Sequence, residues 1–478
     1  MRRIAIMGGG ISGLAAAYTL EQHRRNGAPI EYVVCESSAR LGGVLVTEKV
    51  DGCLVEAGPD SFISEKPWAS DLCRQIGLGE ELIGSNDADR KTYILKKGKL
   101  IVMPDGLMFM VPTKILPTVF SPLFSVRTKL RMAREWFHPP GRVTGDETVA
   151  ELVKRHYGEE MVDRLADPLL SGVYGGEAHQ LSVRAILPRF AEMESKHGSL
   201  GRAMLASRKK MSQARKETAT PLFTSLRDGM RQMVDGVLSQ LPRSVLQVDA
   251  PVQAIQAQDG WTVSAGYHSD HFDSVIIALP AQEAAKILQL AIPGLAAELA
   301  EINYSSSITV TLGYDRAIRE SLPPGFGFLV PRSEGKRMLA CTFVHNKFPH
   351  RAPQDRALIR CFLGGSRDEL ALQLSTDEIL RVAQKELREI IGVNADPLFT
   401  RVYKWKGAMA QYGVGHLERL DRIERLRGHF PGLFLAGNGY RGIGVPDCVR
   451  SGVEAAKNSL VFLGLADAQP SARISQPA

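Results

Sequence analysis

The stretch Ile4-Ala5-Ile6-Met7-Gly8-Gly9-Gly10-Ile11-Ser12-Gly13 decides the fold of this chain. Its first four residues form a short apolar run, which is typical of a buried parallel strand. Gly8, Gly10 and Gly13 follow with the G-x-G-x-x-G spacing that precedes a helix. These glycines permit a tight turn, close approach of a phosphate to the backbone, and close packing of the helix on the strand. The stretch therefore predicts a strand, a turn and a helix that bind a dinucleotide.

A second apolar run, from Ile30 to Cys35, ends at Glu36. This carboxylate falls at the distance from the glycines where a ribose hydroxyl needs an acceptor. The next motif, Arg40-Leu41-Gly42-Gly43, supplies a basic residue and a glycine pair for the other side of the same pyrophosphate. Glu36 alone would suggest only a solvated strand end, but between these two motifs it favours dinucleotide binding.

Length and composition restrict the class of protein. A chain of 478 residues predicts two or three domains, and 44% hydrophobic with 23% charged residues is ordinary for a globular fold. The formal net charge of +7 suits an anionic small molecule or an anionic membrane surface. No Lys/Arg block carries interleaved aromatic residues, so we expect no nucleic-acid partner.

The cysteines and the apolar runs predict the compartment. The 6 cysteines form no C-x-x-C pair and no Cys/His cluster at metal-ligand spacing. We therefore expect no bound metal, no disulfide framework, and a reducing cytoplasm. The first strand begins almost at Met1, which predicts no signal peptide, and no apolar run reaches the roughly 18 residues of a membrane span.

The sequence between the two ends of the chain contains patterns typical of strands and patterns typical of helices. We expect a hairpin over 44–60 that ends in a Gly58-Pro59 loop, where backbone lies beside a bound ring or forms an ordinary β-turn. Helical spacing predicts a helix from Trp68 to Leu82, and a hairpin follows from Thr92 to Val102.

The region 104–140 combines apolar clusters with a basic run. Pro112, Pro117 and Pro122 forbid one long helix, and Arg127 to Arg134 supply the positive charge. This composition fits a protein on a membrane surface, the mouth of an apolar substrate pocket, or an ordinary helical subdomain.

Three further segments carry local signals. Thr144 to Glu147 resembles a capping box before a helix over 148–157. Asp167 to Gly176 is too rich in glycine for a helix interior, so we expect a sharp bend. The polar and basic segment 196–220 predicts a surface loop.

The C-terminal part repeats the form of the opening stretch. A strand near Leu435 leads through the glycine loop 437–444 into a helix from about Pro446 to Leu463. Two helix starts that suit an anion imply one cofactor domain made of separate segments. The predicted fold is mixed α/β: a discontinuous Rossmann-like FAD-binding domain (1–70, 222–280 and 400–465), a mixed-sheet substrate domain (85–103 and 281–399) and a helical subdomain (104–221).

The chain resembles the flavin-containing amine oxidase and protoporphyrinogen oxidase superfamily. The similarity is greatest to the oxygen-dependent porphyrinogen oxidases of haem biosynthesis, which contain FAD. It rests on the glycine motifs at both ends, on Glu56 to Phe62, and on the turn Ser171 to Gly176. The resemblance implies a set of cofactor-binding residues that spans the chain. These are Gly8, Gly9, Gly10, Ile11, Ser12, Gly13, Glu36, Ser37, Arg40, Leu41, Gly42, Gly43, Gly58, Pro59, Asp60, Val252, Trp405, Gly437, Asn438, Ile443, Gly444 and Val445.

The resemblance also implies a substrate and a reaction. Arg90 matches the arginine that binds a substrate propionate, and Gly172, Gly364 and Gly365 would let the porphyrinogen approach the backbone. The implied reaction removes six electrons from protoporphyrinogen IX or coproporphyrinogen III, with O2 reoxidising FAD and H2O2 released. The flavin would carry this chemistry, so no catalytic side chain is assigned, and His345 and His416 favour structural roles.

Three alternatives remain open at this point. Amine oxidases of the same fold place an acidic residue where this chain has Asn438, and carotenoid-type desaturases are disfavoured by Arg90 and the turn 171–176. A non-catalytic FAD-binding protein is the third alternative. Protoporphyrinogen IX and coproporphyrinogen III are not separated, and the chain is either a monomer or a homodimer.

Overall fold

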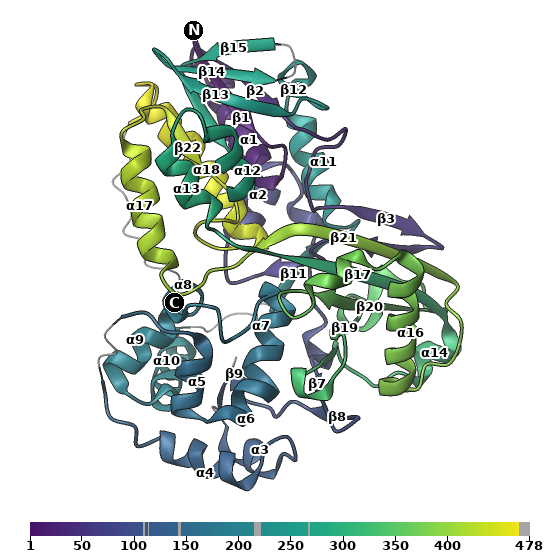
Figure 1. Cartoon of the computed structure of the whole chain (residues 1–478). Coiled ribbons are helices and arrows are strands. Elements are labelled where there is room, and N and C mark those ends of the chain that lie inside the picture. Colours follow the sequence, from purple (N-terminus) through teal and green to yellow (C-terminus); the bar gives the residue numbers. More distant parts are fainter. Residues whose placement is uncertain (109, 113, 142–144, 215–220, 266–267, 468–478) are drawn as a thin grey trace.

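A five-stranded parallel sheet organises one half of the molecule. The computed structural model describes residues 1–467 except 109, 113, 142–144, 215–220 and 266–267 (Figure 1). The strand order is β12-β2-β1-β16-β22, and all neighbours are parallel. The bounds are β1 Arg2–Met7, β2 Ile30–Cys35, β12 Leu246–Gln247, β16 Ser274–Ile277 and β22 Leu433–Leu435.

Alternate residues of β1 face two different cores, as expected for a strand buried on both sides. Ile4 and Ile6 belong to the core formed with α1, α2, α11 and α18, whereas Ala5 and Met7 belong to the core of the opposite face. That second core includes α12, α13, α17 and the antiparallel sheet β13-β14-β15. The bounds are α1 Ile11–Arg25, α2 Trp68–Gln75, α11 Arg231–Gln240, α18 Val445–Phe462, α12 Ala281–Leu288, α13 Pro293–Ala300, α17 His416–Gly428, β13 Val252–Ala257, β14 Trp261–Ala265 and β15 His268–Phe272.

A seven-stranded mixed sheet forms the second part, with the order β21-β17-β20-β19-β18-β7-β8 (Figure 1). Its neighbours are antiparallel except β18 and β7. Because β21 pairs with β17, it belongs to this sheet, although the sequence-based division begins a cofactor segment at residue 400. The bounds are β7 Thr92–Lys96, β8 Lys99–Val102, β17 Tyr304–Asp315, β18 Gly327–Leu329, β19 Met338–Phe343, β20 Arg356–Gly364, β21 Phe399–Ala410, α14 Arg316–Ser321, α15 Val344–Lys347 and α16 Thr376–Ile391.

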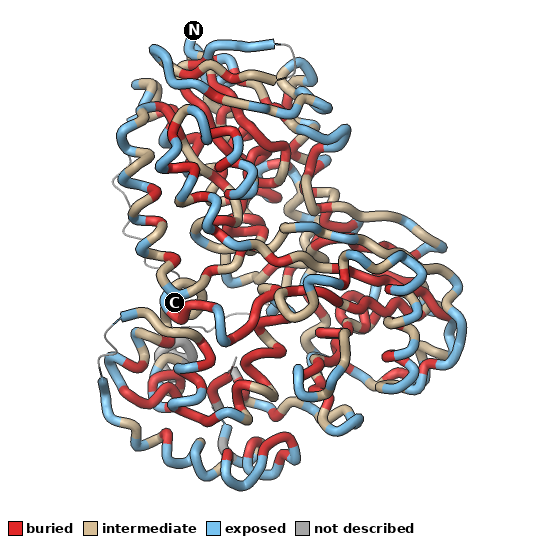
Figure 2. Tube along the Cα trace, viewed as in Figure 1, coloured by how far each residue is buried: buried red, intermediate tan, exposed pale blue. Residues whose placement is uncertain are grey.

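Helices between residues 115 and 214 form a third unit with its own buried core, seen in the lower part of Figure 1 and, in red, in Figure 2. Strand β7 lies between this core and the core on the other face of the seven-stranded sheet, since Ile94 faces the helices while Tyr93 and Leu95 face the sheet core. The bounds are α3 Ile115–Phe120, α4 Val126–Glu135, α5 Val149–His156, α6 Glu159–Met161, a π-helix Val162–Ala166, α7 Asp167–Tyr174, α8 Val183–Ile186, α9 Pro188–His197 and α10 Leu200–Ala214.

Short strands connect the three parts. A hairpin, a three-stranded sheet in the order β5-β11-β6, and the pair β9-β10 complete the described strands. The bounds are β3 Thr47–Val50 and β4 Cys53–Glu56 for the hairpin, then β5 Phe62–Ile63, β6 Leu82–Gly84, β11 Phe223–Leu226, β9 Leu107–Met108 and β10 Val111–Pro112. Among the described residues, no helix is both long enough and apolar enough to cross a membrane.

The mixed α/β class and most elements confirm the sequence prediction, but four local predictions were wrong. The helix predicted from Trp68 to Leu82 ends at Gln75, because Gly77 adopts a left-handed φ of +82°. The capping box before α5 is formed by Thr148 and Glu151. Thr144, in the predicted box, lies outside the described residues.

The other two errors concern segments predicted without helix. Residues 167–174 form α7, and the chain turns only at Gly175, with φ +59°. The glycine at 172 is accepted inside the helix because the helix packs on the adjoining core. Residues 200–214 form α10 rather than a loop, and 215–220 lie outside the described part.

Candidate cofactor and substrate site

The carboxyl ends of the parallel strands meet at one edge of the five-stranded sheet. Met7 is paired with Cys35 on one side and Ile277 on the other, and Ile277 is paired with Leu435. The chain therefore leaves β1, β2 and β22 at the same level, into the predicted glycine turn, Glu36 and glycine loop. Open parallel sheets bind their ligands at this edge.

The first glycine turn has the backbone geometry that the sequence predicts. Gly8 has φ +105°, and a Cβ there would lie 2.6 Å from the carbonyl oxygen of Ala278. The N–H of Gly9 donates to Glu36 Oε2 at 2.8 Å. Gly10 begins α1 without a side-chain cap, and a Cβ there would meet nothing within 4 Å. The start of α1 thus combines available N–H groups with open space, which suits a phosphate.

The second motif, Arg40 to Gly43, contacts the first glycine turn directly. The N–H of Gly42 donates to the carbonyl oxygen of Gly9 at 2.8 Å, and Arg40 Nη2 donates to the carbonyl oxygen of Gly43 at 2.8 Å. A Cβ on Gly43 would lie 3.3 Å from the Cα of Gly10. The structure therefore brings both predicted motifs together, and Leu41 is buried in the core that contains β1 and α1 residues.

The segment before β13 runs beside Glu36. The backbone oxygen of Glu36 accepts from the N–H of Ala250 at 2.9 Å, and that of Ser38 accepts from Asp249 at 3.1 Å. Ser37 Oγ donates to Glu36 Oε1 at 3.3 Å. The predicted contacts at Ser37 and Val252 therefore lie on the same side of the site as the predicted ribose carboxylate.

The loop after β4 is held by donors from the seven-stranded sheet. The carbonyl oxygen of Ala57 accepts from Thr309 Oγ1 and from Trp405 Nε1, each at 2.8 Å. Arg360 Nη2 donates to the carbonyl oxygen of Gly58. A side chain on Gly58 would collide with the backbone of Val44. The predicted residues Gly58, Pro59 and Trp405 are thereby fixed relative to one another.

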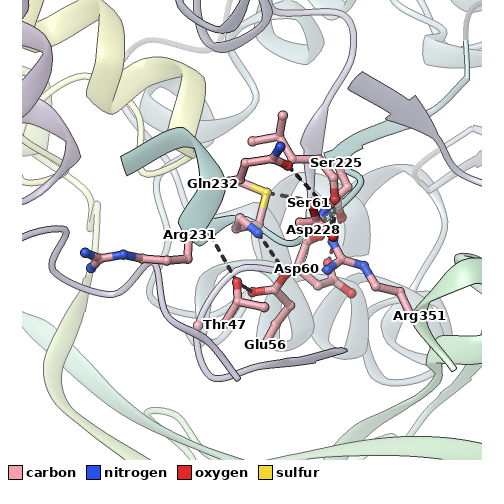
Figure 3. Close-up of polar contacts among 12 residues, drawn as sticks. Thr47, Glu56, Asp60, Ser61, Ser225, Asp228, Arg231, Gln232 and Arg351 are labelled. Carbon is pink, nitrogen blue, oxygen red and sulfur yellow. Dashed lines mark hydrogen bonds and ion pairs between the residues drawn. The ribbon is translucent and has the colours of Figure 1, made fainter. Parts of the chain in front are cut away.

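Figure 3 shows a polar network on the other side of this loop. Glu56 accepts from the N–H of Met230 at 2.9 Å and from Thr47 Oγ1 at 2.7 Å, and it pairs with Arg351 Nη1 at 2.8 Å. Burial raises the pKa of Glu56, and Arg351 opposes that rise. The backbone oxygen of Asp60 accepts from Ser225 Oγ at 2.7 Å. The network joins the loop to the turn before α11.

Asp60 lies in a buried group of charges that the sequence analysis did not identify. Lys347 Nζ donates to both carboxylate oxygens, at 3.0 and 3.1 Å, and Arg360 Nη1 lies 4.0 Å from Oδ2. Burial acts to raise the pKa of Asp60, but Lys347 and Arg360 outweigh it and hold the pKa below its usual range. The available signal was an arginine inside the apolar strand 357–363, where an unpaired charge would be costly.

The C-terminal glycine loop is fixed by its neighbours. The N–H of Gly437 donates to Ser451 Oγ at 3.1 Å, and Asn438 Nδ2 donates to the carbonyl oxygen of Ala408 at 2.8 Å. Tyr412 OH donates to the backbone oxygen of Asn438 at 2.6 Å. Gly444 begins α18 without a side-chain cap, between the predicted residues Ile443 and Val445. A second helix start is therefore available beside the first.

A second ion pair lies at the start of α18 and was also absent from the sequence prediction. Lys66 Nζ donates to Asp447 Oδ1 and Oδ2 at 2.9 and 2.7 Å. Asp447 is 4% exposed, and a Cβ on Gly442 would collide with its carboxyl group. Their separation in sequence, |i−j| = 381, explains why no local pattern revealed the pair.

The predicted substrate residues are only partly brought together. Gly364 ends β20 and Gly365 follows it. The N–H of Ser366 donates to the carbonyl oxygen of Gly175 at 2.9 Å, at the end of α7. Gly172 is exposed inside α7, where a Cβ would lie 3.5 Å from Leu329 Cδ2.

Arg90 lies before β7, the parallel partner of β18, which carries Leu329. Its side chain is exposed and has no polar contact among the described residues. An exposed cation therefore stands at the start of β7, one strand away from β18, which contacts α7.

The two histidines considered from sequence have structural contacts. His345 is 1% exposed, and its Nδ1 accepts from the N–H of Leu358 at 3.1 Å. Burial lowers the pKa of His345 to about 4. His416 stacks on Tyr412 and lies 2.9 Å from the carbonyl oxygen of Tyr440. Both are thus occupied in packing, as the sequence analysis favoured.

The donor set at the strand edge fits FAD. Two uncapped helix starts supply N–H groups for phosphate or carbonyl oxygens, and Glu36 supplies a carboxylate for a ribose. Gly10 and Gly43 have no side chains, so no side chain of theirs covers the backbone where the two motifs meet.

Comparison with known proteins agrees with this geometry. The family model of flavin containing amine oxidoreductases matches residues 11–459. The chain is 32% identical to coproporphyrinogen III oxidase of Bacillus subtilis (strain 168), covering 97% of this chain and 98% of the relative. It is 28% identical to protoporphyrinogen oxidase 2 of Arabidopsis thaliana, covering 97% and 94%.

Solved structures show the same fold. A structure described as that of a protoporphyrinogen oxidase from Exiguobacterium sp. 255-15 superposes with a TM-score of 0.86 at 29% identity, covering 97% of this chain and 99% of the other. Cyclohexylamine oxidase from Brevibacterium oxydans IH-35A shares the fold at a TM-score of 0.67 and 19% identity, covering 97% and 99%. The chain belongs to the flavin containing amine oxidoreductase family and is an FAD-dependent oxidoreductase.

Proposed function

We propose that this protein is a porphyrinogen oxidase of haem biosynthesis, with coproporphyrinogen III as its first candidate substrate and O2 as electron acceptor. The observation that carries the proposal is similarity over nearly the full length to a relative named coproporphyrinogen III oxidase. Removing six electrons and six protons from the substrate gives the porphyrin, and three O2 become three H2O2. Protoporphyrinogen IX is the second candidate, because the chain is also similar to an enzyme named for it.

The division of labour follows from the site. A bound FAD would supply the electron acceptor, so the residues of the protein would bind, orient and shield the reactants. Backbone N–H groups at the starts of α1 and α18 and the carboxylate of Glu36 would hold the cofactor. Trp405 and Arg360 fix the carbonyl oxygens of Ala57 and Gly58, which keeps that loop in place while substrate enters and leaves.

Substrate binding would use the face formed by α7 and β18. The guanidinium of Arg90 is free to bind a propionate with two parallel hydrogen bonds. Gly172 leaves α7 without a side chain beside Leu329, so a flat macrocycle could approach the helix there. The contact between Gly365 and Gly175 would close one side of the same space. We also propose that the chain is divided into the cofactor, substrate and helical domains that the sequence predicts.

The decisive experiment is oxygen uptake by the yellow protein with each porphyrinogen in turn. We expect oxygen consumption with H2O2 release and a fluorescent porphyrin product. Under anaerobic conditions the substrate should bleach the flavin absorbance. If neither porphyrinogen bleaches the flavin but an amine or a carotenoid precursor does, the protein is an oxidoreductase whose proposed substrate is wrong. If no donor bleaches it, the protein is a non-catalytic flavoprotein.

The helical unit would lie on an anionic membrane surface. Apolar side chains of α3, α4 and the residues just after α4 are exposed. Figure 1 places these two helices at the edge of the molecule farthest from the N-terminus. Leu116 is 69%, Phe120 80% and Leu130 67% exposed. Arg127 and Arg131 add positive charge on the same short helix. Apolar insertion combined with basic residues is the pattern of a peripheral membrane contact.

A further inference from the structure

A cluster of histidine and glutamate side chains lies in the helical unit, outside the cofactor site. His138 follows α4, His156 ends α5, and Glu194 lies on α9. One ligand atom from each residue lies within 4.8 Å of the other two. The sequence predicts no metal ligands here, because these residues are far apart along the chain and only the fold brings them together.

The ring of His156 is oriented by a fourth residue. Its Nδ1 lies 3.1 Å from Glu135 Oε1, and its Nε2 lies 3.0 Å from Glu194 Oε1. Glu135 is fixed in turn, since it accepts from the N–H of Leu200 at 2.6 Å and from Ser199 Oγ at 3.0 Å. An imidazole that donates its Nδ1–H to a carboxylate presents Nε2 to a metal, an arrangement common among metal-binding histidines.

His138 has the same arrangement with a different acceptor. Its Nδ1 lies 3.0 Å from the carbonyl oxygen of Pro139, so the tautomer protonated there leaves Nε2 free. The ring centroids of His138 and His156 are 4.6 Å apart. His138 is partly exposed, whereas His156 and Glu194 are buried. An ion could therefore enter past His138 and find two ligands already positioned.

We propose that His138, His156 and Glu194 bind a divalent transition metal ion, with Zn²⁺ the best match. Two imidazole nitrogens and one carboxylate oxygen, with water in the fourth position, form a common zinc ligand set. The ion takes the place of the proton between His156 and Glu194. Ligand atoms stand about 3.3 Å apart around a tetrahedral ion with bonds of about 2.0 Å. His156 Nε2 and Glu194 Oε1, now 3.0 Å apart, would open slightly, and the His138 ligand atom, within 4.8 Å of the other ligand atoms, would move inward.

Neighbouring charges set the expected strength of binding. Arg155 Nη2 donates to both oxygens of Glu194, at 2.7 and 2.8 Å, and Arg155 also binds Glu147. The arginine holds Glu194 in place, but its positive charge opposes a second cation. We therefore expect weaker binding than at a closed structural zinc site. The bound ion would link the end of α4 to α5 and α9, in the same unit as the exposed apolar side chains of α3 and α4.

The test is equilibrium dialysis of the FAD-loaded, chelator-treated protein against Zn²⁺, with bound metal measured by mass spectrometry. We expect one ion per chain. Replacing Zn²⁺ with Co²⁺ should give the visible absorption of a four-coordinate nitrogen and oxygen site. The His138→Ala variant should bind at least tenfold more weakly. The matched control is His179→Ala, which removes an exposed histidine of the same unit and should bind as the wild type does.

The orienting residue gives an independent test. Glu135→Gln keeps one acceptor oxygen for the N–H of Leu200 and turns its amide nitrogen to Ser199 Oγ, which can accept. The variant loses the negative charge that orients His156, so affinity should fall about 10- to 100-fold. Flavin absorbance and thermal midpoint establish that each variant is folded, and His138→Gln replaces His138→Ala if the latter is not. The proposal is overturned if the wild type binds no Zn²⁺, or if the folded His138 variants bind it as tightly as the wild type.

Discussion

Gly452 of α18 packs directly against the carbonyl oxygen of Ser12 in α1, and a Cβ at position 452 would collide with that oxygen. The two helices that begin at the glycine turns are therefore packed backbone to backbone. This contact joins the first and last parts of the chain and sets the spacing between their uncapped starts. A cofactor held by both helix starts depends on that spacing.

Replacing Gly452 with Ala should separate α1 from α18. The obstacle is backbone rather than a flexible side chain, so we expect a loss of about 1–3 kcal/mol and a lower content of bound FAD. The thermal midpoint and the ratio of flavin to protein absorbance measure both effects. Gly428→Ala is the matched control, because a Cβ at position 428, the last residue of α17, would meet nothing within 4 Å. Equal behaviour of the two variants would contradict the packing argument.

The sequence predicted the local structure around the proposed cofactor site better than the local structure around the proposed substrate face. The turn at Gly8 and the strand before it are local patterns, and the parallel sheet then places Glu36 and Gly437 beside them. The ion pairs Lys347–Asp60 and Lys66–Asp447 join residues hundreds of positions apart, so no local pattern reveals them. The bend predicted around Gly172 was wrong because burial of α7 outweighs the low helix propensity of glycine.

Arg90→Ala should weaken substrate binding without loss of flavin. Removing a charged hydrogen-bond donor costs about 1.5–3 kcal/mol, which raises KM for the porphyrinogen roughly 10- to 100-fold. Steady-state oxygen uptake gives KM and kcat, and flavin absorbance gives FAD content. Lys91→Ala removes a neighbouring exposed cation and should change KM little. Equal loss of FAD and substrate affinity in Arg90→Ala would exclude a role restricted to substrate.

Asn438→Asp should disturb the C-terminal glycine loop. The change replaces the Nδ2 donor to the carbonyl oxygen of Ala408 with a second oxygen, so a repulsive contact of about 1–3 kcal/mol results at neutral pH. We expect lower FAD retention, measured by gel filtration and absorbance. Asn394→Asp is the control, since Asn394 makes the same kind of bond to Gly392 at an exposed site. Full FAD retention in Asn438→Asp would show that the bond is dispensable.

The apolar surface of α3 and α4 should determine vesicle binding. Phe120→Ser and Leu130→Ser together remove two exposed apolar side chains, each worth about 1.5–3 kcal/mol when buried in lipid. We expect the fraction that sediments with anionic vesicles to fall sharply, and wild-type binding to weaken with salt. Leu290→Ser, a side chain 80% exposed elsewhere, is the control. Absence of wild-type binding at low salt would remove the membrane proposal.

His345 should make the protein less stable in mild acid. Burial lowers the pKa of His345 to about 4 in the folded chain, below the usual value near 6.5. As pH falls from about 6.5 to 4, the unfolded chain binds a proton at this site before the folded chain does, so stability falls by about 2–3 kcal/mol. His345→Asn keeps an acceptor for Leu358 and removes the titration. The difference in thermal midpoint between wild type and variant should therefore shift in favour of the variant on acidification. The exposed His268→Asn variant should follow the wild type throughout, and parallel curves for all three proteins would contradict the assignment.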